Sequence, residues 1–240
     1  MIDLHSHIIP GVDDGARSLE EAIALCRAAW NDGTKVMVAT PHVFNGVYEQ
    51  KRSDIQDRFR ELKEQLLSDG IALEILQGAE VYSRPDLPEV LERDPSLTLN
   101  GGSRYFLLEF PHQVIPPRAD ELIFRLVAKN FIPVIVHPER NFHIQDSSKL
   151  LEKFIRLGAL CQVTAMSVTG GFGKRARECA HELLTEDLVH VIASDAHNIK
   201  SLPPLLSEAR RYISKWLGIN KAQELFETFP EKILNAKPVL

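Results

Sequence analysis

The stretch IPVIVHPER (Ile132–Arg140) carries the pattern that decides the fold, because an apolar run passes directly into a histidine and two charged residues. A continuous apolar run of this kind is typical of a parallel strand that is buried on both faces. LVHVIAS (Leu188–Ser194) has the same character and is followed by Asp195. Both stretches predict buried strands with polar side chains at their carboxyl ends.

Similar apolar runs alternate with amphipathic stretches along the chain, which predicts a parallel sheet with helices on its outside. We favour a closed barrel over an open doubly wound sheet, because no Gly-x-Gly-x-x-Gly turn follows the first strand. No internal repeat, low-complexity segment or linker divides residues 1–240, so we expect one domain. The predicted strands are Met1–His5, Val36–Thr40, Ala72–Gly78, Tyr105–Phe110, Ile132–Val136, Leu160–Thr164 and Val189–Ser194.

The first amphipathic stretch shows how the predicted helices are bounded. Ser18 stands at its start with Glu21 three residues later, which is the spacing of a capping box, and Gly33 follows its end. Further helices are predicted for residues 53–70, Arg118–Lys129, Ser147–Leu157, Lys174–Leu184 and Pro203–Leu217, with one or two short helices in Lys221–Leu234.

Composition narrows the class of protein. The chain has 28 Lys and Arg against 33 Asp and Glu, and its formal charge of −5 does not favour nucleic acid or an anionic membrane as the main partner. Cys26, Cys161 and Cys179 are odd in number and far apart, so we expect a reducing compartment and no disulfide framework. No secretory signal pattern and no apolar run near ~20 residues is found, so we expect a cytoplasmic protein without a membrane span.

Nearly every predicted strand ends in a residue that can bind a metal ion. In a parallel barrel the carboxyl ends of all strands meet at one face, so these residues would converge there. His5 and His7 are two positions apart and should project together from the first strand. Asp13 and Asp14 can reach in from the loop that follows. The other strand ends supply His42, Glu80, Glu109, His137, Gln162, Thr164, Asp195 and His197.

Imidazole and carboxylate ligands together favour manganese, iron or zinc. So many ligand residues exceed the needs of one ion, and they fit two or three divalent ions that share a bridging carboxylate. Such clusters can convert a bound water to hydroxide at neutral pH and hold both oxygens of an in-line displacement. The strand ends therefore predict hydrolysis of a phosphate ester by metal-activated hydroxide.

Two cations near these strand ends could contact a phosphate group. Arg140 could bind phosphate through two parallel hydrogen bonds, or it could form only a structural ion pair. Lys200, shortly after His197, is a second candidate for the same task. A lone histidine is more often a hydrogen-bonded structural residue than a ligand. We interpret the remaining histidines in that way: His112, His143, His181 and His190.

Spacing excludes two other ways of handling phosphate. Cysteine-based phosphatases need a Cys-x5-Arg loop, and the residues six positions after the three cysteines are Asp32, Ser167 and Thr185. TGGFGK (Thr169–Lys174) lacks the Gly-x-x-x-x-Gly-Lys-Ser/Thr spacing of a phosphate-binding loop. We interpret it as a flexible loop that leads into a helix and could rim the site.

The motifs DLHSH, TPH, GAE, LLEF, VIVHPER and VIASDAHN resemble those of the polymerase-and-histidinol-phosphatase superfamily. Within it, MIDLHSHIIPGVDDGARSLEEA and DLVHVIASDAHN are similar to bacterial metal-dependent tyrosine-protein phosphatases of capsule and exopolysaccharide loci, the CpsB/YwqE type. The resemblance covers essentially the whole chain. It implies a distorted seven-stranded β/α barrel of the TIM-like kind with a three-metal site that commonly holds manganese or iron.

The resemblance also implies a role for each residue that matches its motifs. Arg140 falls where relatives have a phosphate-contacting arginine, and Asp195 or a water would manage the proton. Glu80 would bridge two ions. The first ion would be held by His5, His7, Glu80 and Asp195, the second by Glu80, Glu109 and His137, and the third by His42, His197 and either Asp13 or Asp14.

The implied substrate is phosphotyrosine on a cognate, membrane-associated bacterial tyrosine autokinase that controls capsule or exopolysaccharide synthesis. A tyrosine phenol, with a pKa of ~10, leaves with little help from a general acid. The sequence departs from its relatives in one place. They often carry a second arginine shortly after the Asp-x-His-Asn motif, whereas Lys200 is the nearest cation here.

Three alternatives stay open at this point. The first is a small-molecule phosphatase of the same superfamily that acts on histidinol phosphate. The second is another barrel hydrolase, an amidohydrolase or a TatD-like nuclease. Amidohydrolases usually bridge their metals with a lysine, where this chain has Glu109, and the low basic charge argues against a nuclease. The third is a non-catalytic regulatory partner of the kinase.

Overall fold

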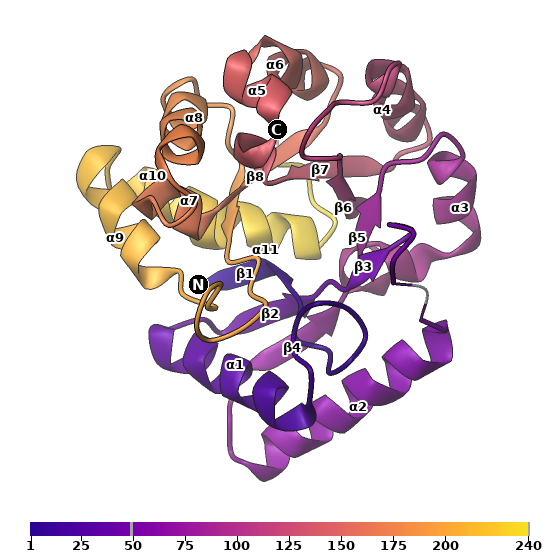
Figure 1. Cartoon of the computed structure of the whole chain (residues 1–240), viewed down its shortest axis with the longest axis vertical. Coiled ribbons are helices and arrows are strands. Elements are labelled where there is room, and N and C mark those ends of the chain that lie inside the picture. Colours follow the sequence, from indigo (N-terminus) through magenta and orange to yellow (C-terminus); the bar gives the residue numbers. More distant parts are fainter. Residues whose placement is uncertain (49, 240) are drawn as a thin grey trace.

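The computed structural model describes residues 1–48 and 50–239, and strands and helices alternate through them. Figure 1 shows the strands in the centre of the molecule and the helices around them. The strands are β1 (Ile2–Ser6), β2 (Val36–Ala39), β3 (His42–Val43), β4 (Glu74–Gln77), β5 (Glu80–Tyr82), β6 (Tyr105–Glu109), β7 (Ile132–Val136), β8 (Leu160–Thr164) and β9 (Val191–Ala193).

The helices occupy the predicted amphipathic stretches, and three short helices were not predicted. Those three are α3, α5 and α7, each too brief to show a clear helical period. The α-helices are α1 (Leu19–Asp32), α2 (Arg52–Ser68), α3 (Leu87–Arg93), α4 (Ala119–Ala128), α5 (Phe142–Asp146), α6 (Lys149–Arg156), α7 (Ala165–Thr169), α8 (Lys174–Thr185), α9 (Ser207–Trp216), α10 (Ile219–Gln223) and α11 (Phe229–Leu234). Short turns of other helix types are η1 (Pro95–Leu97), η2 (Leu99–Gly101), η3 (Pro138–Arg140) and η4 (Glu224–Thr228).

The strands form two parallel sheets, so the prediction of one closed seven-stranded barrel needs correction. One sheet has the order β1-β2-β4 and the other the order β3-β5-β6-β7-β8-β9. The breaks fall at Pro41, between β2 and β3, and at Gly78, between β4 and β5. Proline lacks the N–H that a continuous ladder needs. A Cβ at Gly78 would lie 3.0 Å from Leu99 Cδ2, so the chain packs tightly at this break.

At these breaks the two neighbouring chain segments stay hydrogen-bonded to each other. The Gly78 N–H donates to the carbonyl of Ala39 (2.9 Å), and the Glu80 N–H donates to the carbonyl of Pro41 (3.1 Å). At the other edge, β1 meets the segment after β9 through the isolated parallel bridge between Ser6 and Ala196. The α/β architecture with parallel strands and outer helices therefore agrees with the prediction, whereas the single unbroken sheet does not.

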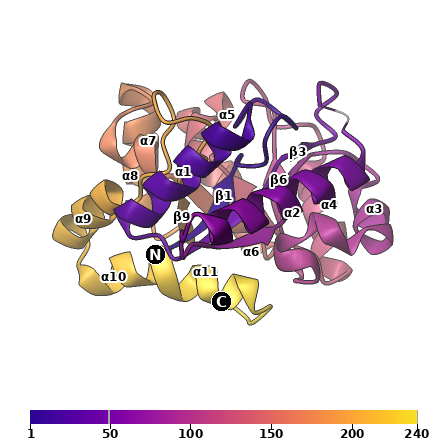
Figure 2. The same cartoon turned by 90° about the horizontal axis from the view of Figure 1, so that it is seen from below.

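The hydrophobic core has a layer between the sheets and layers under the helices. The inner layer joins Leu4 and Val38 of one sheet to Leu107 and Val134 of the other, and Ile233 of α11 belongs to it. Figure 2 shows α10 and α11 together on one side of the strands. Because this C-terminal segment packs near the amino ends of the strands, the carboxyl ends are left for polar side chains.

The first helix illustrates how local sequence sets the element bounds. The Ser18 Oγ accepts a hydrogen bond from the Glu21 N–H (3.3 Å), and Gly33 ends the helix in the left-handed conformation with φ of 99°. The Glu21 carboxylate accepts a hydrogen bond from the Arg17 N–H (3.0 Å), one residue before the position that the predicted capping box requires.

Two chain-wide features bear on the sequence predictions. Cys26, Cys161 and Cys179 are free and buried. Within the described residues, the structure contains no helix with both the length and the apolar character needed to cross a membrane. The extent of the domain, residues 1–240, stays a prediction.

Candidate metal centre

The first group of predicted ligands meets at the carboxyl end of β1. The Nε2 atoms of His5 and His7 lie 3.2 Å apart. Glu80 Oε2 is 3.4 Å from each of these nitrogens. Asp195 Oδ1 is 3.3 Å from the His5 nitrogen and 3.4 Å from the His7 nitrogen. Four side chains that are distant in sequence therefore face one common point.

Glu80 also faces a second group of side chains. Its Oε1 lies 2.9 Å from His137 Nε2, and its Oε2 lies 2.9 Å from His42 Nδ1. Glu109 Oε2 is 3.6 Å from the same His42 nitrogen. The bend before β5 places Glu80, which is only 1% exposed, at the centre of the predicted site. Its two oxygens point to different histidines, as a bridging ligand requires.

A third group lies closer to solvent and contains Asp14. Its Oδ1 is 3.5 Å from His42 Nε2 and 3.6 Å from His197 Nε2. One ligand atom from each of His7, Asp14, His42 and His197 lies within 4.8 Å of the others. The half-exposed Asp14 carboxylate therefore has the position of a ligand in an open site.

Asp13 has a different place, behind His7. Its Oδ2 lies 2.8 Å from His7 Nδ1 and accepts a hydrogen bond from the His42 N–H (3.2 Å). Its Oδ1 accepts from the Gly15 N–H (3.0 Å). Sequence reasoning kept both aspartates as candidates because it could not separate them. The structure gives them different positions: Asp14 faces the cluster, and Asp13 contacts His7 from behind.

Three histidines of the cluster are held through Nδ1. The partner of His5 Nδ1 is Gln162 Oε1 (2.8 Å), that of His7 is Asp13, and that of His197 is the carbonyl of Asp195 (2.8 Å). An acceptor at Nδ1 fixes the proton there and leaves Nε2 with its lone pair toward the cluster. Gln162 was predicted only as a strand-end residue, and its contact with His5 gives it an orienting role.

The arrangement fits divalent cations. With protons on both Nδ1 atoms, the Nε2 lone pairs of His5 and His7 face each other at 3.2 Å, which is repulsive unless a cation lies between them. His42 Nδ1 and Glu80 Oε2 are buried without a hydrogen-bond partner although they approach within 2.9 Å. Such a mixed set of imidazole nitrogens and carboxylate oxygens suits manganese, iron or zinc.

The pKa directions agree with a site that stabilises positive charge. Burial opposes protonation of His5, but the carboxylates of Glu80 and Asp195 outweigh it and raise its pKa to about 9. Burial also opposes ionisation of Asp195, but His5 and His7 hold its pKa well below its usual range. Burial and the nearby Glu80 raise the pKa of Glu109 to about 7, because two carboxylates here repel each other.

Two candidate ligands stand in strained backbone conformations. His137 has φ of 36° and Asp195 has φ of 55°, and both follow directly after the end of a predicted strand. Left-handed conformations of non-glycine residues cost on the order of 1–3 kcal/mol and cluster at functional sites. Here they occur where strands β7 and β9 deliver side chains to the cluster.

Arg140 lies at the edge of this cluster. Its Nη1 donates to Asp195 Oδ2 (2.6 Å), and its guanidinium lies 4.5 Å from the ring centroid of Phe172. Phe172 belongs to the TGGFGK segment, so that loop rims the site. Lys200 is exposed in a turn where its N–H donates to Asn198 Oδ1 (3.0 Å).

Sequence reasoning missed the position of His112. One ligand atom from each of Glu109, His112 and His137 lies within 4.8 Å of the others, so this histidine belongs to the cluster. Its place three residues after Glu109, just past the end of a predicted strand, was the available signal. The other three histidines have backbone partners, as interpreted: Ile115 N for His143, the Val168 carbonyl for His181 and Cys161 N for His190.

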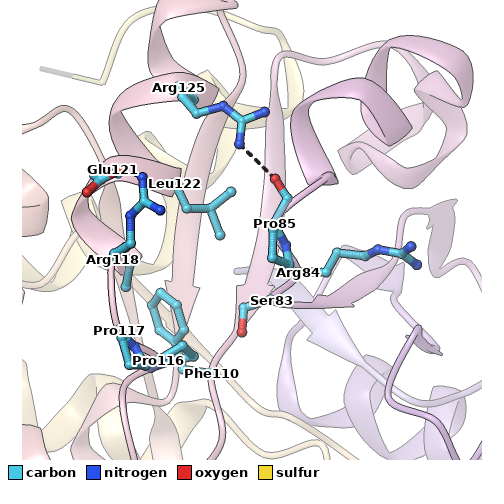
Figure 3. Close-up of a pocket in the computed structure, with 11 residues that line it drawn as sticks. Ser83, Arg84, Pro85, Phe110, Pro116, Pro117, Arg118, Glu121, Leu122 and Arg125 are labelled. Carbon is cyan, nitrogen blue, oxygen red and sulfur yellow. Dashed lines mark hydrogen bonds and ion pairs between the residues drawn. The ribbon is translucent and has the colours of Figure 1, made fainter.

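A separate cavity of about 230 Å³ lies beside β5 and β6, lined by residues that include Ser83, Phe110 and Leu122. Figure 3 shows Phe110 and Leu122 between the segments that carry Arg84 and Arg118, with Arg125 bonded to the Pro85 carbonyl. The three guanidiniums are already paired with carboxylates. The pairs are Arg84–Asp86, Arg118–Glu121 and Arg125–Glu89.

Comparison with known proteins identifies the family. A family model described as capsular polysaccharide synthesis, CpsB/CapC, matches residues 1–235. The chain belongs to the CpsB/CapC family. This finding confirms the resemblance drawn from the sequence motifs.

Individual relatives of the CpsB/CapC family match over nearly the whole chain. The tyrosine-protein phosphatase YwqE of Bacillus subtilis (strain 168) is 37% identical over 218 residues, which cover 91% of this chain and 85% of YwqE. The tyrosine-protein phosphatase CpsB of Streptococcus pneumoniae is 35% identical over 239 residues, 98% of each chain. One solved structure, described with YwqE of Bacillus subtilis and CpsB of Streptococcus pneumoniae as unique metal-dependent tyrosine phosphatases, has a TM-score of 0.94 at 34% identity and covers 100% of this chain and 96% of its own.

Proposed function

We propose that this chain is a metal-dependent protein-tyrosine phosphatase. The observation that carries the proposal is the position of Glu80, whose carboxylate oxygens face His5, His7, His42 and His137 at 2.9–3.4 Å. CpsB/CapC-family relatives with this activity in their names support it. We further propose that the substrate is phosphotyrosine on a membrane-associated bacterial tyrosine autokinase that controls capsule or exopolysaccharide synthesis, and that the protein is cytoplasmic.

In this proposal the cluster holds two or three divalent ions, with manganese first and iron or zinc as alternatives. Bound ions supply a nucleophilic water at neutral pH and neutralise the charge of the phosphate group. Glu80 would be a ligand shared by two of them, and Asp14 would be the ligand in the outer group. The proposed ligands are His5, His7, Asp14, His42, Glu80, Glu109, His137, Asp195 and His197.

Arg140 is the residue that we propose for phosphate binding. Its guanidinium can offer parallel N–H groups to two phosphate oxygens. The contact with Asp195 and the ring of Phe172 hold it at the edge of the cluster, so it needs no large movement to meet a phosphate group there. Lys200, exposed in its turn, is at most an accessory contact.

The phenol of tyrosine is a good leaving group, which limits what the protein must provide. With a pKa of ~10, the phenolate departs with little proton assistance. Asp195 lies within reach of His5, His7 and Arg140, so we propose that it orients the attacking water. Its low pKa makes the carboxylate a weak base, so solvent takes the proton.

The test compares two substrates on one metal-analysed preparation. We expect phosphate release from a phosphotyrosyl peptide that requires Mn²⁺ and stops with a chelator. Faster hydrolysis of histidinol phosphate than of the peptide would indicate a small-molecule phosphatase instead. Full metal occupancy without turnover of either compound would contradict the phosphatase assignment and point to another hydrolase substrate. A protein that binds no metal and turns over neither compound would favour a regulatory role.

A further inference from the structure

We propose that His112 is an additional metal ligand, at the Glu109–His137 edge of the cluster. The inference deepens the proposed function and rests on it, because it assumes that this cluster binds metal ions. It adds a second imidazole to the position that Glu80, Glu109 and His137 form.

Distance supports direct ligation by His112. One ligand atom from each of Glu109, His112 and His137 lies within 4.8 Å of the others. Ligands at ~2.0–2.2 Å from one ion are at most ~4.4 Å apart, so a closing movement of a few tenths of an ångström suffices. The rings of His112 and His137 are neighbours, with centroids 5.3 Å apart and planes inclined by 39°.

The imidazole of His112 has a buried nitrogen that needs a hydrogen-bond partner or a metal ion. Its Nε2 is shut off from solvent and has no hydrogen-bond partner among the described residues. Leaving such a buried polar atom unsatisfied is destabilising, because it loses its hydrogen bonds to water without gaining others. The small cavity beside the ring, lined by Phe110, Ile115 and Ile144 among others, measures about 10 Å³, which is at the lower limit for one water. A bound cation would satisfy this nitrogen.

The backbone ties His112 to the segment that carries His137. The carbonyl of His112 accepts a hydrogen bond from the Phe142 N–H (2.9 Å). The carbonyl of Pro111 accepts from Asn141 Nδ2 (2.7 Å), and Asn141 directly follows Arg140. The two imidazoles are therefore held in a fixed relation, as ligands of one ion must be.

The first experiment measures metal binding and does not depend on activity. His112→Ala is compared with Gln113→Ala, which changes the exposed neighbouring residue. Ions per chain are counted after dialysis, and the affinity of the weakest ion is measured by competition with a chelator. We expect His112→Ala to weaken one ion by at least about tenfold, with no change in Gln113→Ala. If His112→Ala fails to fold, His112→Gln keeps the size of the side chain and is measured in its place.

A second variant reports ligation directly. His112→Cys, loaded with Co²⁺, should show a thiolate-to-cobalt charge-transfer band that is absent from the wild type, whose cysteines are buried elsewhere. Unchanged ion count and affinity in His112→Ala would overturn the proposal, as would a His112→Cys protein that binds Co²⁺ without this band. Weaker phosphate binding with unchanged metal affinity would also overturn it. A wild type that binds ions but does not hydrolyse phosphotyrosine would refute the proposed function alone.

Discussion

His5 and His190 are buried histidines at opposite ends of the parallel strands, and their surroundings push them in opposite directions. His5, near the carboxyl end of β1, has its pKa raised to about 9, since the carboxylates of Glu80 and Asp195 outweigh burial. His190, just before β9, has its pKa lowered to about 4 by burial and by Lys221. The same residue type thus serves a charged cluster at one end and a neutral interior at the other. The comparison shows that neighbouring carboxylates, and not burial alone, distinguish His5 from His190.

Removing the carboxylate of Glu80, which faces two groups of the cluster, should have the largest effect on metal binding and activity. In Glu80→Gln we expect metal loss and a fall of about a thousandfold in hydrolysis of an aryl phosphate, because several kcal/mol of transition-state stabilisation depend on the bound ions. Metal content and turnover are measured on the same sample, with Glu182→Gln on the exposed face of α8 as the control. If Glu80→Gln were about as active as the control, Glu80 could not be a metal ligand that the reaction needs.

The adjacent aspartates sharpen the comparison within the charged end. Asp14→Asn should lose one ion, with affinity for it reduced by about a hundredfold. Asp13→Asn should keep the full number of ions and bind them about tenfold more weakly, because its carboxylate orients His7 without facing the cluster. Competition with a chelator measures the metal affinity of both variants. A larger loss of affinity in Asp13→Asn than in Asp14→Asn would make Asp13 the ligand and Asp14 the orienting residue.

Arg140 tests whether the charged end binds phosphate as well as metal. Arg140→Lys keeps the positive charge but loses the forked donors, so we expect kcat/KM on a phosphotyrosyl peptide to fall by about ten- to a hundredfold with metal content unchanged. Arg156→Lys on the surface of α6 is the matched control. An unaltered kcat/KM in Arg140→Lys would reduce Arg140 to the structural ion pair with Asp195.

His190 provides the prediction for the neutral end. Its Nδ1 accepts a hydrogen bond from the Cys161 N–H (3.2 Å), which requires the neutral ring. The unfolded chain binds a proton near pH 6.5 and the folded chain only near pH 4, so the stabilising contribution is lost as the pH falls between these values. At pH 5 the loss should be about 2 kcal/mol. Urea unfolding of wild type and His190→Gln at several pH values from 7.5 to 5 measures this loss. The same change in the free energy of unfolding with pH in both proteins would contradict the account.

The sequence predicted the elements that long apolar runs specify. Continuous apolar runs such as IPVIVH are typical of parallel strands that are buried on both faces. The ends of these runs carry most of the candidate ligands. The break at Gly78 was not predicted, because the apolar pattern runs through this residue, and the approach of Leu99 to it comes from another part of the chain. Two sheets therefore replace the single seven-stranded sheet that the sequence predicted.

Within the site, residues with a repeated spacing were easier to find than isolated ones. His5 and His7 follow from the two-residue period of a strand. Asp13 and Asp14 are adjacent in a loop, so only the loop conformation separates the residue that faces the cluster from the one that holds His7. His112 stands alone after Pro111, so the sequence offered only its place just past a predicted strand, and its position beside His137 in the structure brings it into the cluster.

The most direct test of the central claim is a metal titration of phosphotyrosyl-peptide hydrolysis on ion-depleted protein, with bound ions counted at each point. The account predicts no turnover without ions and a rate that rises with occupancy as Mn²⁺ fills the cluster around Glu80. Full turnover by protein that verifiably contains no divalent ion would contradict it, because the strand-end residues would then have no metal-dependent role in the reaction.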